Sequence, residues 1–248
     1  MSAAPILAVE RIGKHFGAFA ALKDVSVAFP AGQLTAIIGP NGAGKSTFFD
    51  IISGAFRPSS GRIRFEGRDI TLLPQHQFAR IGIAKSFQIT NLFRQLSAHE
   101  NVRVAAQMRR SRFELLKPRS ALRGLDECAD ALLQRVGLAG VGRQRAADLA
   151  HGQQRALEIA MALAAEPRLL LMDEPTAGMS PEETSAMMNL IVRIAQERTV
   201  VLVEHKMKLV MGICQRLVVL HHGELLAQGT PDEIRSNTDV RRVYLGQH

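Results

Sequence analysis

A nine-residue run, GPNGAGKST at residues 39–47, constrains the fold of this chain more than any other feature. It follows the apolar stretch LTAII and precedes a segment of helical pattern, the context in which glycine-rich loops bind phosphate. Lys45 is expected to reach the β- and γ-phosphates of a nucleotide, and Ser46 to bind Mg²⁺. The predicted nucleotide site, called the phosphate loop below, consists of Gly39, Pro40, Asn41, Gly42, Ala43, Gly44, Lys45, Ser46 and Thr47.

Two further apolar runs, RLLLMDE and TVVLVEH, are typical of strands covered on both faces of a parallel sheet. The segment between them begins as a capped helix, with Ser180 as N-cap, Pro181 at the first helical position and Glu183 closing a capping box. This order predicts a right-handed βαβ unit. Asp173 and Glu174 end the first strand, at the sheet edge where α/β proteins bind ligands. There Asp173 is expected to hold Mg²⁺ and Glu174 to orient and deprotonate a water.

The pattern of apolar residues divides the rest of the chain into a β-rich segment and a helical segment. Residues 6–87 contain short apolar runs bounded by Gly and Pro, which predicts a β-rich segment. Residues 97–148 have a helical pattern that opens with a capping box of Ser97 and Glu100. The stretch TPDEI at residues 230–234 caps a last short helix in the same way.

Composition limits the classes of protein that the chain can represent. Its 248 residues are 46% hydrophobic, which is enough for a buried core. Cys128 and Cys214 lie far apart with no Cys/His cluster, which argues against a disulfide framework or a zinc site. No stretch approaches 18 uninterrupted apolar residues, and a charge interrupts the N-terminus before a signal-peptide core forms. We therefore expect a cytoplasmic chain that does not itself span a membrane.

The net charge of +8 makes an anionic partner plausible without identifying it. Six of its basic residues fall within residues 109–123, RRSRFELLKPRSALR, which contain one acid. This segment is either a solvated helix and loop or a contact for anionic headgroups near a membrane.

Five motifs occur in the order GPNGAGKST, SFQ, LAHGQQR, LLLMDEPTAGMSP and VEH. This order resembles the ATP-binding-cassette (ABC) ATPases, from Phe16 to His205. Within that superfamily the chain is most similar to the ATP-binding subunits of branched-chain amino acid importers. The likeness lies in AKSFQITNLFRQLSAHENVRVAAQ, GQQRALEIAMAL, VEHKMKLVMGIC and VRRVYLG.

The resemblance implies an α/β fold. Its centre is a P-loop NTPase (RecA-like) core with a mainly parallel sheet, joined by an N-terminal antiparallel β subdomain and an inserted α-helical subdomain. It further implies a single nucleotide-binding domain over residues 1–248. Residues 1–87 and 162–248 would form the catalytic core with its β subdomain, and residues 88–161 the helical subdomain.

The resemblance also assigns roles. Phe16 would stack on adenine, and Gln88 would sense Mg²⁺ and the attacking water. His205 would contact the γ-phosphate. The implied catalytic residues are thus Glu174, His205, Gln88 and Lys45, and the implied Mg²⁺ ligands are Ser46, Gln88 and Asp173. In AGMSP, Gly178 and Ser180 match a loop that joins two cassettes.

In this family a signature segment of one cassette covers the ATP held by another. Here that segment is Ala150, His151, Gly152 and Gln153, with Ala150 and His151 where Ser and Gly are expected. Ala150 removes a hydroxyl, whose hydrogen bond to a charged group contributes about 1 to 3 kcal/mol. Because the amides and dipole of the following helix still favour anions, we expect the segment to function.

The resemblance implies an ATP-hydrolysing, energy-coupling importer subunit that uses ATP and Mg²⁺, peripheral on the cytoplasmic face of the inner membrane. Its partners would be integral membrane permease subunits, a second ABC ATPase, identical or related, and indirectly an extracytoplasmic solute-binding protein. The ATPase of lipopolysaccharide export and a urea or amide importer stay open as alternatives. A nucleic-acid-associated ATPase is disfavoured because the chain has no heptad run, and a non-hydrolysing regulator is disfavoured by Glu174 and His205.

Overall fold

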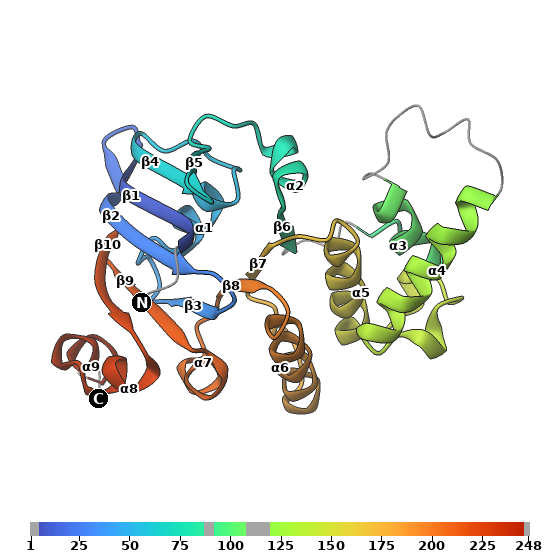
Figure 1. Ribbon diagram of the computed structural model, residues 1–248. Helices are drawn as coiled ribbons and strands as arrows, with labels where there is room; N and C mark the ends of the chain where they lie inside the picture. Colours follow the sequence, from blue (N-terminus) through green and yellow to red (C-terminus); the bar gives the residue numbers. More distant parts are fainter. Residues whose placement is uncertain (1–4, 87–91, 108–119, 246–248) are drawn as a thin grey trace.

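A six-stranded sheet forms the centre of the computed structural model, which describes residues 5–86, 92–107 and 120–245 (Figure 1). The strand order is β10-β9-β3-β8-β7-β6, and every neighbouring pair except β10 and β9 is parallel. The strands are β3 (Leu34–Ile38), β6 (Ile83–Ser86), β7 (Leu169–Asp173), β8 (Thr199–Val203), β9 (Arg216–His221) and β10 (Glu224–Gly229). The predicted mainly parallel sheet is confirmed.

Side chains of the central strands alternate between two buried apolar layers. On β7, Leu169 and Leu171 belong to the layer that includes helix α1 (Lys45–Ile52), called the α1 layer below. Leu170 and Met172 belong to the layer on the opposite face, called the helical layer because most of the helices pack in it. Burial on both faces explains why these strands are continuous apolar runs in the sequence.

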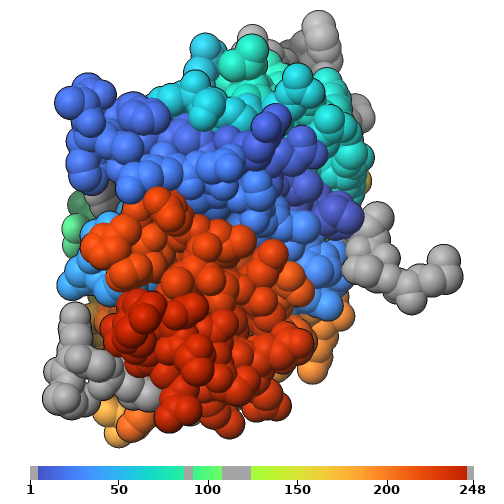
Figure 2. All heavy atoms as spheres, turned by 90° about the vertical axis from the view of Figure 1, so that its left-hand side faces the viewer, coloured from blue at the N-terminus to red at the C-terminus, as the bar shows by residue number. Residues whose placement is uncertain are grey.

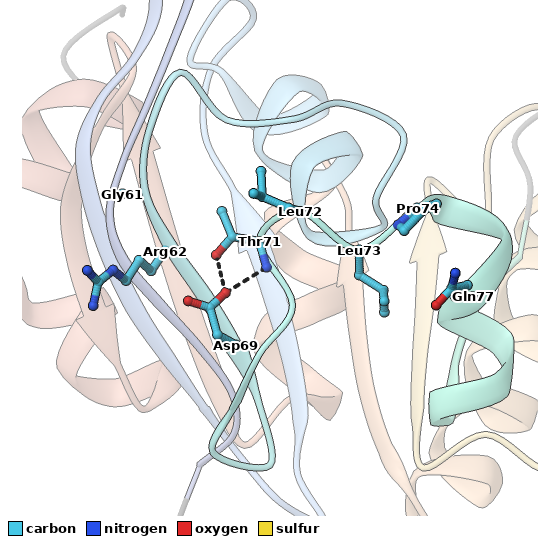
Figure 3. Close-up of a pocket in the computed structure, with 8 residues that line it drawn as sticks. All are labelled: Gly61, Arg62, Asp69, Thr71, Leu72, Leu73, Pro74 and Gln77. Carbon is cyan, nitrogen blue, oxygen red and sulfur yellow. Dashed lines mark hydrogen bonds between the residues drawn. The ribbon is translucent and has the colours of Figure 1, made fainter.

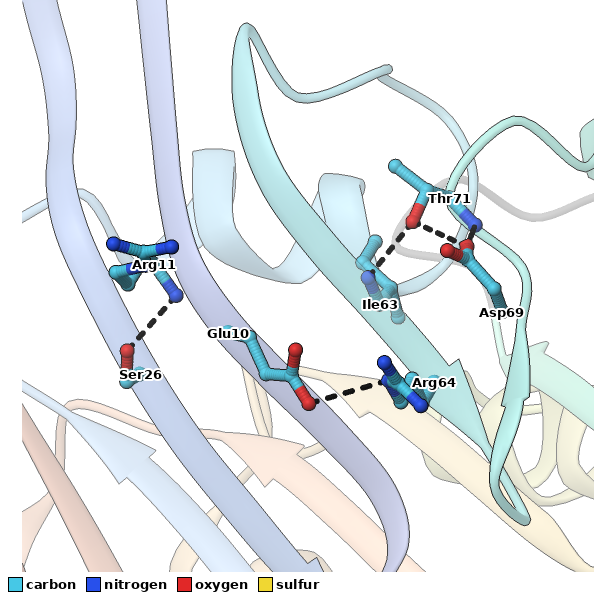
Figure 4. A network of polar contacts seen from close by, with 7 residues as sticks. All are labelled: Glu10, Arg11, Ser26, Ile63, Arg64, Asp69 and Thr71. Atoms are coloured by element: carbon cyan, nitrogen blue, oxygen red, sulfur yellow. Dashed lines mark hydrogen bonds and ion pairs between the residues drawn. The ribbon is translucent and has the colours of Figure 1, made fainter.

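A second sheet, antiparallel and in the order β2-β1-β4-β5, covers the α1 layer. Its strands are β1 (Pro5–Phe16), β2 (Phe19–Pro30), β4 (Ser60–Phe65) and β5 (Arg68–Asp69). Leu7, Ile12 and Phe29 are fully buried beneath it. On its other face polar side chains link the strands, as in the ion pair of Glu10 with Arg64 at 3.2 Å (Figure 4). The N-terminal antiparallel subdomain is therefore present as predicted.

Helices α3 (Ala98–Gln107), α4 (Ser120–Arg135) and α5 (His151–Leu163) pack together, apart from the antiparallel sheet (Figure 1). Helix α6 (Pro181–Ala195) connects the parallel neighbours β7 and β8, and α7 (Met207–Ile213) follows β8. Shorter helical turns are η1 (Gln75–Gln77), α2 (Phe78–Ile81), η3 (Ala139–Val141) and η4 (Ala146–Asp148). The helical pattern predicted for residues 97–148 is thus confirmed over the described part of that range.

All three predicted capping boxes are present. In each, the hydroxyl accepts a hydrogen bond from the third helical amide and the carboxylate accepts one from the N-cap amide, at 2.7 to 3.4 Å. The pairs are Ser97 with Glu100, Ser180 with Glu183 and Thr230 with Glu233. Each box satisfies amides that a helix end otherwise leaves without a partner.

The C-terminal part of the chain supports the phosphate loop. Hairpin β9–β10 meets the N-terminal sheet, with β10 beside β2 (Figure 2). Helices α8 (Pro231–Ser236) and α9 (Thr238–Leu245) pack against that hairpin. In the hairpin turn, the Gly223 amide donates to the Ala43 carbonyl at 3.1 Å, and the Gly223 carbonyl accepts from the Lys23 amide at 2.8 Å. A turn near the C-terminus thereby fixes the loop near the N-terminus.

Some predictions concern residues that the structure does not describe. Gln88 lies outside the described residues. So do residues 108–119, which include most of the basic segment at residues 109–123. The subdomain limits at residues 88 and 162 stay a prediction. Across the described ranges, no helix combines the length and the apolar character needed to cross a bilayer.

The two-layer core predicts a large stability loss for a truncation in its central strand. Leu202 on β8 is fully buried, so Leu202→Ala is expected to lower the free energy of unfolding by about 2 to 5 kcal/mol. Leu72 is 71% exposed, and the matched control Leu72→Ala should stay within about 0.5 kcal/mol of the parent chain. Urea unfolding of both variants measures the difference, and equal midpoints would contradict the assignment of Leu202 to the core.

Candidate functional site

The phosphate loop leaves the carboxyl end of β3 and enters α1, as the sequence predicts. Its backbone is packed too closely to accept larger residues at two positions. A Cβ on Gly39 would lie 2.4 Å from the Leu220 carbonyl oxygen. Gly44 has φ of +93°, a left-handed conformation that favours glycine, and a Cβ there would lie 2.9 Å from the Ala21 carbonyl oxygen.

The N-terminus of α1 is suited to an anion. Its N-cap is Gly44, which supplies no side-chain cap, and its first turn carries no acidic residue. The amides of that turn therefore keep their hydrogen-bonding capacity, and the helix dipole adds positive potential. Ser46, the second residue of the helix, is exposed. This combination is the one that binds phosphate at helix N-termini.

Lys45 is folded back on the loop. Its Nζ donates to the carbonyl oxygens of Gly39 at 2.7 Å and Pro40 at 2.9 Å, and only 7% of the residue is exposed. Burial lowers the pKa of the Lys45 ammonium, and the nearby Glu174 carboxylate opposes that shift. The cation thus lies at the loop with incomplete charge compensation, which a phosphate would supply.

Asp173 ends β7 at the edge where the phosphate loop also begins, because β3, β8 and β7 are successive parallel strands. Burial raises the pKa of the Asp173 carboxyl above its ordinary value; Lys85 opposes the shift, whereas Glu174 and Asp50 add to it. Lys85 forms an ion pair with Asp50 at 2.9 Å. Asp173 therefore lies in a cluster of three acids and two lysines around the loop.

Glu174 follows in a strained conformation. Its φ is +43°, a left-handed value that costs free energy at any residue with a Cβ. Its amide donates to the Val203 carbonyl at 3.0 Å, and its carbonyl accepts from the Ala177 amide at 3.0 Å. The Glu174 carboxylate lies 3.8 Å from Nδ1 of His205, which follows β8 and is half exposed. The acid and the histidine predicted to flank the γ-phosphate are therefore neighbours.

The side chains at this edge fit a magnesium ion held partly by a nucleotide. Within the described ranges, no group of three or more His, Cys, Asp or Glu could hold a metal by itself. Mg²⁺ in phosphate-transfer sites takes one or two protein oxygens and fills its other positions with phosphate and water. The exposed Ser46 hydroxyl and the Asp173 carboxylate are oxygens of that kind.

Phe16 lies at the end of β1 and is 46% exposed. Its ring meets that of Phe56 edge to face, with centroids 5.8 Å apart, and Lys14 Nζ lies 5.0 Å from its centroid. A partly exposed aromatic of this kind offers a surface on which a base can stack. Its role in holding adenine stays a prediction.

The signature segment opens α5. Ala150 is the N-cap and has no oxygen in its side chain, but Gln153 Oε1 accepts from the Ala150 amide at 3.0 Å. The Gly152 amide donates to Glu183 Oε1 at 3.3 Å, and His151 lies beside Gly178. The segment therefore contacts the turn and helix that follow Asp173 and Glu174. The Glu183 carboxylate takes up one amide of the helix end that is predicted to face an anion.

The structure adds three residues to the predicted site, of which the sequence analysis named only Glu183, and only as a capping residue. Lys85 and Asp50 pair beside Asp173, and Glu183 joins the signature segment to α6. The position of Lys85 just before SFQ was the one available signal, because β6 runs parallel to β7 and brings their carboxyl ends together.

An open pocket of about 550 Å³ lies elsewhere, beside the β4–β5 hairpin (Figure 3). Within it Asp69 Oδ1 accepts from the Thr71 hydroxyl at 2.6 Å and from the Thr71 amide at 2.9 Å, which lowers the pKa of the Asp69 carboxyl. Its lining residues are Gly61, Arg62, Asp69, Thr71, Leu72, Leu73, Pro74 and Gln77. None of them belongs to the predicted site, so this pocket is separate from the phosphate loop.

Comparison with known proteins decides the family. Residues 22–177 match the family model described as ABC transporter, and residues 224–248 match the model described as branched-chain amino acid ATP-binding cassette transporter. The chain belongs to the ABC transporter family. The cassette fold inferred from the order of its motifs is therefore confirmed.

Among relatives of this cassette is LivG of Salmonella typhimurium, a high-affinity branched-chain amino acid transport ATP-binding protein, at 41% identity over 98% of both chains. BraF of Pseudomonas aeruginosa, described in the same words, is 40% identical over 98% of both. LptB of Haemophilus influenzae, a lipopolysaccharide export system ATP-binding protein, is 32% identical over 98% of both.

Solved structures agree with the fold of this cassette. A nucleotide-free ATP-binding cassette from an ABC transporter superposes with a TM-score of 0.84 at 29% identity, covering 98% of this chain and 100% of that chain. The ADP conformation of an ABC transporter cassette gives a TM-score of 0.84 at 29% identity, covering 98% and 99%.

The raised pKa of Asp173 predicts that its charge destabilises the nucleotide-free cassette. A carboxyl whose folded pKa exceeds its unfolded value lowers stability at neutral pH, and this cost disappears as pH falls toward the ordinary value of 3.8. Asp173→Asn is therefore expected to raise the unfolding temperature at pH 7.5, with a smaller gain near pH 4.5. Thermal unfolding without nucleotide tests this, and a lower temperature for the variant at pH 7.5 would contradict it.

Proposed function

We propose that this cassette is the ATP-hydrolysing subunit of an importer for branched-chain amino acids. The match of residues 224–248 to the branched-chain family model supports the substrate class. The higher identity to LivG and BraF than to LptB supports it further. The neighbouring carboxylate of Glu174 and imidazole of His205, at the edge where the phosphate loop begins, support hydrolysis.

ATP would bind with its phosphates on the phosphate loop. The amides of the first turn of α1 would donate to phosphate oxygens, and Lys45 would exchange its two carbonyl partners for the β- and γ-phosphates. Phe16 would stack on the adenine. Ser46, Asp173 and Gln88 would hold Mg²⁺, which would supply positive charge to neutralise the phosphates.

Hydrolysis would proceed by in-line attack of water on the γ-phosphorus. Glu174 would orient the water and take its proton as the new P–O bond forms and the bond to the β–γ bridging oxygen breaks. ADP would leave with that bridging oxygen. His205 would contact the γ-phosphate, and Gln88 would help to place the water. Most of the rate enhancement would come from positioning and charge stabilisation.

Transport would require a second cassette and a membrane partner. The signature segment at the start of α5 would cover the ATP of an identical or related cassette, and that cassette would cover the ATP bound here. A solved cassette dimer, described as a post-hydrolysis state bound to ADP and phosphate, supports this at 26% identity and a TM-score of 0.77. The dimer would act on integral permease subunits from the cytoplasmic face, and an extracytoplasmic solute-binding protein would deliver the substrate.

Loss of the loop cation tests nucleotide binding. Lys45→Ala removes the ammonium that would pair with two phosphates, and we expect ATP affinity to fall at least about 100-fold. Lys23→Ala is the control, because Lys23 is an exposed lysine in a 3.5 Å ion pair with Glu224. Equilibrium binding of a fluorescent ATP analogue measures both. Parent-level affinity in the Lys45 variant would overturn the phosphate-loop assignment.

Removal of the proposed base separates binding from chemistry. Glu174→Gln keeps the shape of the side chain but cannot accept the proton, so it should bind ATP, accumulate as a dimer and hydrolyse at least about 100-fold more slowly. Glu10→Gln, which breaks an exposed ion pair on the antiparallel sheet, is the control. Phosphate release and size-exclusion chromatography with ATP measure the two effects. Undiminished hydrolysis would remove Glu174 from the role of base.

The same variant tests the transported substrate in cells. Uptake of labelled leucine, beside an unrelated labelled solute, is measured in cells whose sole copy carries Glu174→Gln or Glu10→Gln. Selective loss of leucine uptake with Glu174→Gln is the expected result. Persistent leucine uptake would leave an ATPase that powers another system, such as envelope-lipid export.

A further inference from the structure

Glu204 is a buried acid whose presence packing alone does not explain. It is 0% exposed, directly follows the apolar strand β8, and precedes His205. No ion pair joins it to a basic side chain in the described part of the chain, and its Oε2 has no hydrogen-bond partner there. Taking a carboxylate out of water without full pairing is costly, so an apolar residue would serve packing better.

The other oxygen of Glu204 is fully used. Oε1 accepts from the Thr176 hydroxyl at 2.6 Å and from the Thr176 amide at 3.3 Å. Thr176 is itself 0% exposed, so both bonds are shielded from water. The Glu204 amide donates to the carbonyl of Ile37, two residues before the phosphate loop, at 3.3 Å. Glu204 therefore links β3, the strand that leads to the phosphate loop, with the turn after β7. It does so directly before His205 in the sequence.

The turn after β7 contains the strained residue Glu174. Glu174, with φ of +43°, is two residues before Thr176, and the Thr176 carbonyl accepts from the Met179 amide at 3.3 Å. Strained backbone persists where surrounding contacts over-determine it. The hydrogen bonds of Glu204 to Thr176, with those of the Glu174 backbone to Val203 and Ala177, provide such contacts on both sides of the base.

We propose that Glu204 is a positioning residue for hydrolysis: through Thr176 it holds the turn that orients the Glu174 carboxylate next to His205. This inference rests on the proposed function, because it assumes that Glu174 is the base. A positioning role for Glu204 predicts a different outcome from a purely structural role. An apolar replacement of similar size would keep the nucleotide contacts and would impair the placement of the base, so kcat would fall while KM for ATP stays close to the parent value.

Two variants of conserved shape test the hydrogen bonding between Glu204 and Thr176, and a third variant keeps that hydrogen bonding. Glu204→Met removes both hydrogen bonds to Thr176, and Thr176→Val removes the shorter one, from the hydroxyl. Each is expected to lower kcat at least about tenfold while KM for ATP changes less than about threefold. The double variant should lose no more kcat than Glu204→Met alone, because Glu204→Met already removes the hydroxyl bond that Thr176→Val removes. Glu204→Gln keeps an acceptor for Thr176 and should retain kcat within about threefold.

Thr35→Val is the matched control. Thr35 lies on β3, is 0% exposed like Thr176, and its hydroxyl has no hydrogen-bond partner in the described structure. The substitution is the same in size and burial, so kcat should be unchanged. Thermal unfolding of every variant completes the set. We expect Glu204→Met to stay fully folded at the assay temperature while kcat falls, and a loss of kcat that appears only with unfolding would point to a structural role.

The outcomes separate this inference from the proposed function. If Glu174→Gln abolishes hydrolysis but Thr176→Val and Glu204→Met keep kcat within about twofold, the positioning role is wrong and the base stands. Strictly additive losses in the double variant, or a rise in KM for ATP as large as the fall in kcat, would also overturn it. Should Glu204→Met fail to fold, Thr176→Val decides alone. If Glu174→Gln hydrolyses ATP at the parent rate, the proposed function fails before Glu204 is considered.

Discussion

The close packing of the phosphate-loop backbone against neighbouring strands is the constraint on which the other parts of the structure depend. Backbone atoms of β9 and β2 approach Gly39 and Gly44 so closely that a Cβ at either position would meet a carbonyl oxygen at less than 3 Å. These contacts bind the turn between β3 and α1 to both sheets at once. The loop fixes where β3 ends, and the strand order then brings Asp173, Glu174 and His205 to the same edge.

Charges at this edge are arranged for a ligand. Without one, burial disfavours the charge of Lys45 and that of Asp173 alike, because each carries a pKa shift toward its neutral form. A bound nucleotide with its metal ion would bring the opposite charges that both side chains lack. Each of these two charges thus has an electrostatic cost that a bound nucleotide would offset, so affinity and stability are opposed at the two positions.

Features that depend on neighbouring residues were predictable from the sequence, and features that depend on strand order were not. The capping box of Ser180 and Glu183 involves residues three apart, and buried strands appear directly as apolar runs. The ion pair of Lys85 with Asp50 requires β6 to lie near α1, which no local pattern encodes. The second bond of Glu183, to the Gly152 amide, likewise depends on how α5 meets α6. The order of the motifs therefore predicted which residues form the site. The charged residues that surround them could be identified only from the three-dimensional structure.

The alternation of strand side chains between two layers has a consequence for how such a chain can change over time. On β8, Val201 and Val203 face the α1 layer, while Val200 and Leu202 face the helical layer. A substitution on one face leaves the side chains of the other face in place, since only the strand backbone is shared. Substitutions on the faces of α3 and α4 that pack in the helical layer therefore need not move the side chains beneath the phosphate loop. The central sheet separates the packing of the helical layer from the packing that supports the nucleotide site.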